Sequence, residues 1–182
     1  RCNAFGLRYI FQNKKFDYLI VMDGDGEDRP VEIKSLINMI NENPSKSVVA
    51  KRVKRSEGPF FKLLYQIHKL ITFIFTGKNI NFGNYSILTK NDVGKLHSKA
   101  SVWSSFSGSV KKHLSDLNEI NSIRGLRYFG PSKMSLLKLI IHSFSIIAVF
   151  RNQVFIRSTL MIIVLTYLNS YFGNFLFTII IL

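Results

Sequence analysis

The sequence has a single cysteine, Cys2, and this scarcity excludes an intrachain disulfide framework and a cysteine-based metal site. It is also poor in negative charge, because eleven Asp and Glu stand against 25 Lys and Arg and give a formal net charge of +14. No acidic residue follows Glu119, although six Lys or Arg do. A chain this basic is suited to an anionic partner, which could be nucleic acid, an anionic membrane surface or a phosphorylated substrate.

A long uncharged segment closes the chain. Residues 158–182 read STLMIIVLTYLNSYFGNFLFTIIIL and carry no formal charge. As a helix that rises ~1.5 Å per residue, this segment would be about 37 Å long, against a hydrocarbon core of ~30 Å. We therefore predict a transmembrane helix over 158–182, with a long buried core helix as the alternative. Arg151 and Arg157 precede it, so the positive-inside tendency puts residues 1–157 in the cytoplasm. A membrane segment argues against nucleic acid as the partner.

The first third of the chain alternates between helical and extended patterns. Helices are expected over residues 3–12 and from Asp28 onward, where Asp28 can cap and Pro30 suits the first turn. Short apolar strands are expected over 18–22 and 47–50. This order predicts an α/β fold with a mainly parallel sheet.

Two further helices are expected to be almost entirely apolar, over 59–75 and 134–150. The second has one narrow polar stripe, formed by Ser135, Lys138, His142 and Ser145. A helix this apolar is either deeply buried or lies in a membrane interface. Its place before the uncharged segment favours an interfacial amphipathic helix with a basic linker over residues 134–157.

Five of the eleven acidic residues lie between positions 23 and 32, at the end of the first strand: Asp23, Asp25, Glu27, Asp28 and Glu32. Ligands of open α/β sheets bind beyond the carboxyl ends of the strands. An Asp-x-Asp pair there can hold a hard divalent cation, Mg²⁺ or Mn²⁺, which can neutralise a diphosphate. The alternative is a solvated acidic turn. A calcium loop of the EF-hand type is excluded because its sixth position is Asp28 and its twelfth is Lys34.

The segment DYLIVMDGDGEDRPVEI resembles the Asp-x-Asp segment of family-2 glycosyltransferases, especially the dolichol-phosphate mannosyltransferase-like, polyprenyl-phosphate-linked branch. Asp23, Asp25, Asp28 and Glu32 fall on the acidic positions of that pattern, and Glu27 replaces a Gln. Three later segments are similar to further motifs of the family in the same order: AKRVKRSEGPFFKLLYQIHKLI, NFGNYSILTKNDV and RYFGPSKMS.

The resemblance implies a Rossmann-like GT-A domain over residues 1–133 and an inverting, metal-dependent transfer. The donor would be a nucleotide-diphosphate sugar, and the acceptor dolichyl or undecaprenyl phosphate. Asp25 would bind the metal directly, and Asp23 would contact the metal or the nucleotide. The expected location is the bacterial inner membrane or its equivalent, with the catalytic domain cytoplasmic and membrane lipids as neighbours.

Two departures from the family pattern bear on the mechanism. Asn84 stands where many relatives carry an Asp, and Ser86 where they carry an Arg. Asn84 cannot act as a base, but an acceptor phosphate is already mostly ionised at pH 7 and needs none. Asn84 at this candidate catalytic position therefore indicates either a lipid-phosphate acceptor or a changed loop. Relatives also begin with a strand and a nucleotide-binding loop before the position of Arg1, so we expect an N-terminally truncated sequence. The activity of this stretch by itself is left open.

Basic side chains are the remaining candidates for substrate binding. Arg52 and Arg55 are suited to the donor diphosphate or the acceptor phosphate, with a solvated basic turn as the alternative. Arg127, Ser132 and Lys133 belong to the RYFGPSKMS segment, and the resemblance suggests that they bind the lipid phosphate. Attraction of anionic headgroups is the alternative role. The four histidines show no metal-ligand spacing and are expected to be structural.

The sequence therefore predicts a membrane-anchored glycosyltransferase. The alternative from another class is a non-catalytic, truncated or degenerate relative that binds lipid phosphate or a partner subunit at the membrane.

Overall fold

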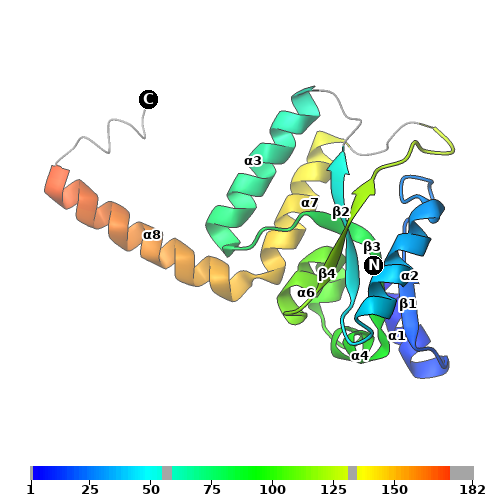
Figure 1. Ribbon diagram of the computed structural model, residues 1–182. Coiled ribbons are helices and arrows are strands. Elements are labelled where there is room, and N and C mark those ends of the chain that lie inside the picture. Colours follow the sequence, from blue (N-terminus) through cyan, green and yellow to red (C-terminus); the bar gives the residue numbers. More distant parts are fainter. Residues whose placement is uncertain (1, 55–58, 131–134, 173–182) are drawn as a thin grey trace.

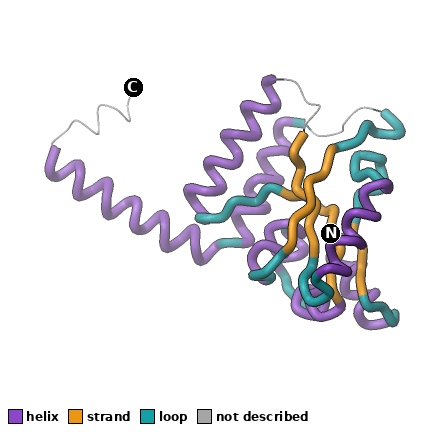
Figure 2. The backbone as a smooth tube through the Cα atoms, viewed as in Figure 1, coloured by secondary structure: helices purple, strands orange, loops and turns teal. Residues whose placement is uncertain are grey.

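A computed structural model describes residues 2–54, 59–130 and 135–172 of the chain. Four strands form one sheet in the order β1-β3-β2-β4. Figure 1 labels the strands, and Figure 2 draws them in orange among the purple helices. The strands are β1 (Tyr18–Val21), β2 (Val48–Lys54), β3 (Phe82–Thr89) and β4 (Asn118–Ile123). β3 runs antiparallel to both of its neighbours, whereas β2 and β4 are parallel.

The α/β class is confirmed, but the expected mainly parallel sheet is not. Three strands share one direction, yet β3 inserts between β1 and β2 and makes two of the three adjacent pairs antiparallel. β3 follows the long helix α3 (Pro59–Thr76). It enters the sheet beside the later part of β2, where Phe82 pairs with Lys51, and therefore runs antiparallel to β2. The carboxyl ends of β1, β2 and β4 still lie toward one edge of the sheet, and the amino-terminal part of β3 lies beside them.

Helices cover both faces of the sheet and give two apolar cores. On one face α1 (Cys2–Asn13), α4 (Lys90–Leu96), α5 (Ser101–Ser104) and α6 (Phe106–His113) pack against Val49 and Leu88. On the other face α2 (Ile33–Glu42) packs against Val48, Ala50 and Tyr85. Successive residues of β2 thus enter opposite cores, as the pleat of a strand requires.

Two more helices complete the described chain, α7 (Leu136–Val149) and α8 (Arg151–Phe172). α8 projects away from the sheet domain in Figure 1. Its first turns are attached to α3, because Arg157 Nη1 donates a hydrogen bond to the backbone oxygen of Ile74 over 3.1 Å. Lys112 Nζ of α6 donates to the oxygen of Val149 over 2.6 Å, which ties the end of α7 to the domain.

The predicted membrane helix begins earlier than expected. α8 starts at Arg151, seven residues before position 158, and includes both arginines that were expected to precede it. Within the described chain one helix, Arg151–Tyr171, is long and apolar enough to cross a membrane by length and composition, and its apolar window is not buried. Residues 173–182 of the predicted span lie outside the described residues.

Candidate functional site

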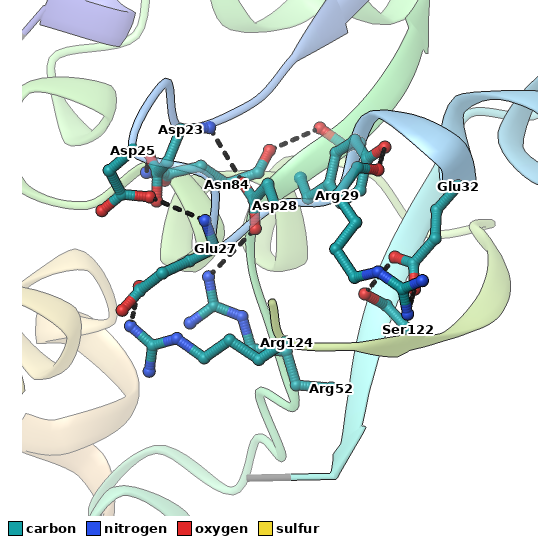
Figure 3. A network of polar contacts seen from close by, with 12 residues as sticks. Asp23, Asp25, Glu27, Asp28, Arg29, Glu32, Arg52, Asn84, Ser122 and Arg124 are labelled. Carbon is teal, nitrogen blue, oxygen red and sulfur yellow. Dashed lines mark hydrogen bonds and ion pairs between the residues drawn. The ribbon is translucent and has the colours of Figure 1, made fainter. Parts of the chain in front are cut away.

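The acidic segment forms a loop at the carboxyl end of β1, and its first carboxylate is oriented from the neighbouring strand. Asn84 Nδ2, on β3, donates a hydrogen bond to Asp23 Oδ1 over 2.9 Å (Figure 3). The backbone nitrogen of Asp23 donates to Asp28 Oδ2, also over 2.9 Å. The Asp23 side chain is therefore held by Asn84 from a distant part of the sequence, and its backbone is held by the nearby Asp28.

Asp25 is fixed by its own turn. Its Oδ1 accepts a hydrogen bond from the backbone nitrogen of Glu27 over 3.1 Å. Gly26 between them has a φ of +89°, a left-handed conformation that favours glycine, and a Cβ there would lie 2.8 Å from the Tyr128 ring. The other oxygen, Asp25 Oδ2, lies 3.2 Å from Arg127 Nη2.

Asp28 stabilises the loop by accepting the hydrogen bond from the Asp23 backbone and does not cap a helix. The predicted cap is therefore wrong. The helical region begins with a 3₁₀ turn, η1 (Pro30–Glu32), whose N-terminal residue Arg29 makes no side-chain cap. The Asp28 side chain is buried and lies 3.4 Å from Arg52 Nη2. Burial raises the pKa of Asp28, opposed by the hydrogen bond from the Asp23 backbone and by the charge of Arg52.

Arg52 reaches Asp28 across β3, from its place on β2. Gly83 lies under the guanidinium, and a Cβ at that position would come 2.8 Å from Nη2 of Arg52. The glycine thus leaves room for the ion pair. This positions one of the predicted phosphate-binding arginines behind the acidic loop, with its charge partly balanced by Asp28.

A second connection holds the far end of the acidic segment. Ser122 Oγ donates to Glu32 Oε2 over 2.6 Å, and the Ile123 nitrogen donates to Glu32 Oε1 over 3.0 Å. Arg29 Nη1 lies 3.9 Å from the same carboxylate. Glu32 therefore joins η1 to the end of β4, and Figure 3 shows it beside Ser122, on the opposite side of the network from Asp25.

The loop after β4, residues 124–128, is clasped to the acidic loop, and sequence reasoning missed this contact. The Glu27 carboxylate pairs with Arg124 through one oxygen and accepts from Arg127 Nε over 2.9 Å through the other. The backbone adds two hydrogen bonds of 2.9 Å, from Gly125 to the oxygen of Glu27 and from Tyr128 to the oxygen of Asp25. A charged Glu27 in place of the family's Gln was the only sequence signal for it.

The structure brings together five of the predicted site residues: Asp23, Asp25, Arg52, Asn84 and Arg127. Arg55, Ser132 and Lys133 lie outside the described residues. The histidines at positions 68, 97, 113 and 142 do not form a metal-ligand cluster with other side chains of the described chain.

The carboxylates of the acidic loop fit a cation whose remaining ligands come from a substrate phosphate. Within the described residues, no three His, Cys, Asp or Glu side chains converge on a point that could hold a metal ion unaided. Asp23 and Asp25 nevertheless offer carboxylate oxygens, and Mg²⁺ is often held by one or two carboxylates together with substrate phosphates. In this structure the positive group beside Asp25 is the guanidinium of Arg127.

No curated protein and no solved structure matches the chain. The family model described as Glycosyl transferase family 2 matches residues 6–106, which is more than half of the 182 residues and includes the acidic loop, Arg52 and Asn84. A domain of this kind takes a sugar donor and an acceptor. The chain belongs to glycosyl transferase family 2.

Proposed function

We propose that this chain transfers a sugar, with inversion and with help from Mg²⁺ or Mn²⁺, from a nucleotide-diphosphate sugar to a polyprenyl phosphate at a membrane surface. The observation that carries the proposal is the paired, oriented carboxylates of Asp23 and Asp25 at the end of β1, with the guanidinium of Arg127 beside them. Membership of the family supplies the reaction class.

Asp23 and Asp25 would hold the divalent cation, and Asn84 would keep the Asp23 carboxylate in place. A bound cation would supply positive charge for the leaving diphosphate. The chain's own cations would add to it, since Arg127 lies 3.2 Å from Asp25 Oδ2 and Arg52 lies directly behind the loop. Guanidinium groups suit phosphate oxygens because they can donate two parallel hydrogen bonds.

The acceptor is proposed from the chemistry of position 84. The Asn84 amide donates to Asp23 and is not basic enough to accept a proton near pH 7, so it does not act as a base. A phosphate acceptor arrives ionised at pH 7. Its oxygen would form a bond to the anomeric carbon while the bond from that carbon to the nucleoside diphosphate breaks. A sugar hydroxyl would need a base in addition.

Exposed apolar faces support a membrane location. α3 exposes one stripe and α7 another, and both helices pack against each other: Leu63, Ile67, Leu70, Ile71 and Ile74 on α3, and Leu137, Ile140, Ile141 and Phe144 on α7. α8 exposes large apolar side chains around its whole circumference. Contiguous apolar surface of this extent is rare on soluble monomers and suits a lipid bilayer. We propose that α8 spans the membrane and that α7 lies at its surface.

The proposal is tested by transfer of labelled sugar from a panel of nucleotide sugars to undecaprenyl phosphate in vesicles, by the full-length protein with and without Mn²⁺. Wild type should transfer only with Mn²⁺, and Asp25→Asn should not transfer. Asp116→Asn is the matched control, because Asp116 is exposed and pairs with Lys46. Metal-independent transfer, or full activity of Asp25→Asn, would refute the metal assignment. Absence of transfer with retained binding to the lipid phosphate would favour the non-catalytic alternative.

A further inference from the structure

Arg127 contacts two carboxylates through two different nitrogens. Nη2 lies 3.2 Å from Asp25 Oδ2, and Nε donates to Glu27 Oε1 over 2.9 Å. All three side chains are partly shielded: 11% of Glu27, 27% of Arg127 and 34% of Asp25 is exposed. The Asp25 contact is therefore the more open of the two, and the Glu27 contact the more enclosed.

The guanidinium and a metal ion would compete for Asp25. Asp25 Oδ1 already accepts the backbone hydrogen bond from Glu27, whereas Oδ2 is the oxygen that faces Arg127. Arginine stays protonated at every physiological pH. A divalent cation on Oδ2 would lie within a few ångströms of that fixed positive charge, which raises the free energy of the pair. Binding at Asp25 thus favours release of Nη2.

Glu27 can keep Arg127 near the site after that release. The Nε contact does not use the nitrogen that touches Asp25, so it can persist while the Nη end moves. Glu27 is itself held in place by Arg124 and by the hydrogen bond from Gly125 to its backbone oxygen. The displaced Nη groups would then face the same space that the donor's diphosphate must enter to reach the metal.

We propose that Arg127 is an internal counter-cation that the divalent metal displaces from Asp25, and that Glu27 is the positioning residue that keeps the displaced guanidinium available to the diphosphate. The inference rests on the proposed metal site at Asp23 and Asp25 and deepens it. It assigns Arg127 opposite effects on two binding steps, because it hinders the metal alone and assists the metal with diphosphate.

Calorimetry on the purified full-length protein separates the two effects, first with MnCl₂ alone and then with inorganic diphosphate at saturating Mn²⁺. Arg127→Gln should bind Mn²⁺ about three- to tenfold more tightly than wild type and bind diphosphate less tightly by a similar factor. Arg8→Gln is the matched control, since it removes the same charge from an exposed position on α1. A residue with only a structural role would weaken both steps.

The role of Glu27 is tested by a double-mutant cycle. Glu27→Gln should weaken diphosphate binding in the wild-type background but change it little further in Arg127→Gln, because Glu27 acts through Arg127. Equal losses in both backgrounds would overturn the positioning role. Thermal unfolding checks each variant, and Arg127→Ala replaces Arg127→Gln if the latter does not fold.

The outcomes distinguish this inference from the proposed function. Equal Mn²⁺ affinity of wild type, Arg127→Gln and Arg8→Gln would overturn the counter-cation role and leave the metal site standing. If wild type binds no Mn²⁺ in the presence or absence of diphosphate, the metal site itself is wrong, and the inference is overturned with it.

Discussion

Asn84 on β3 donates its side-chain amide to Asp23 at the end of β1, over 2.9 Å, so an antiparallel strand orients a carboxylate of its neighbour. The contact depends on β3 lying between β1 and β2, where its amino-terminal half meets the carboxyl end of β1. An amide is suited to this role, because it donates without adding a third negative charge beside Asp23 and Asp28.

Replacing Asn84 with Ala should weaken Mn²⁺ binding by about two- to tenfold, the effect of one lost hydrogen bond of ~0.5–1.5 kcal/mol. The pH–rate profile of transfer should keep its shape, because the proposed acceptor needs no base. Profiles of wild type and Asn84→Ala, measured from pH 5.5 to 9, check this. A basic limb that disappears in the variant would assign proton transfer to this position and argue for a hydroxyl acceptor.

Ionisation of Tyr85 should lower the free energy of unfolding at high pH. Burial, together with the charges of Glu32 and Asp28, raises the pKa of Tyr85 to about 12, and its hydroxyl donates to the Arg29 oxygen over 2.8 Å. The pKa of Tyr85 in the folded protein exceeds the unfolded value of about 10. The protonated Tyr85 side chain therefore stabilises the fold fully below pH 10, and this stabilisation is lost as the pH rises toward 12.

Tyr85→Phe should lower the thermal midpoint by roughly 2–4 °C at pH 7, the cost of about 1 kcal/mol. The gap between variant and wild type should narrow when the midpoints are measured at pH 10.5. Tyr9→Phe, at an exposed position on α1, is the control and should change neither value. A gap that stays constant with pH would contradict the assigned ionisation.

Lys112→Met should loosen the junction between the sheet domain and the last two helices. The ammonium of Lys112 donates to the oxygen of Val149 at the end of α7, where positive charge is favourable. We expect the free energy of unfolding to fall by about 1 kcal/mol. The measurements are a lower midpoint of thermal unfolding and faster proteolysis near residue 150. Lys111→Met, the neighbouring lysine of α6, should unfold like wild type; equal effects of the two substitutions would argue against this contact.

If α8 spans a bilayer, charges at its centre should abolish insertion. Ile162→Lys combined with Val164→Lys should release the protein on alkaline carbonate extraction, since each lysine costs about 2.5–3.5 kcal/mol at a helix centre. Wild type should stay in the membrane pellet. Asn152→Lys, in the first turn of α8, is the control and should remain inserted. Extraction of wild-type protein would contradict the span.

The position of the acidic loop could be predicted from local signals. The apolar residues of β1 and the carboxylates that follow them are adjacent in the chain, so the pattern contains both the strand and the loop at its end. Asp23 and Asp25 were identified as candidates in this way, and Arg52 was identified from the basic run at the second strand. The structure brings all three to one edge of the sheet.

Contacts between distant segments could not be predicted. β4 is mostly polar and has Ile120 and Ser122 as its buried residues, so it has no clear strand signal. Its position comes from pairing with β2. The clasp between Glu27 and Arg127 joins residues one hundred positions apart, and only the folded sheet brings them together. Asp28 illustrates the opposite error, because its spacing fits a helix cap while burial gives it a different role.

The clasp at Tyr128 also limits how far the donor site can lie from the last helices. Tyr128 is bonded to the backbone of Asp25, and α7 begins eight residues later at Leu136. Eight residues of fully extended chain span at most roughly 28 Å. If α7 rests on the bilayer, Asp25 therefore lies no farther than roughly this distance from the start of that helix, and an acceptor group held well beyond it would not meet the sugar.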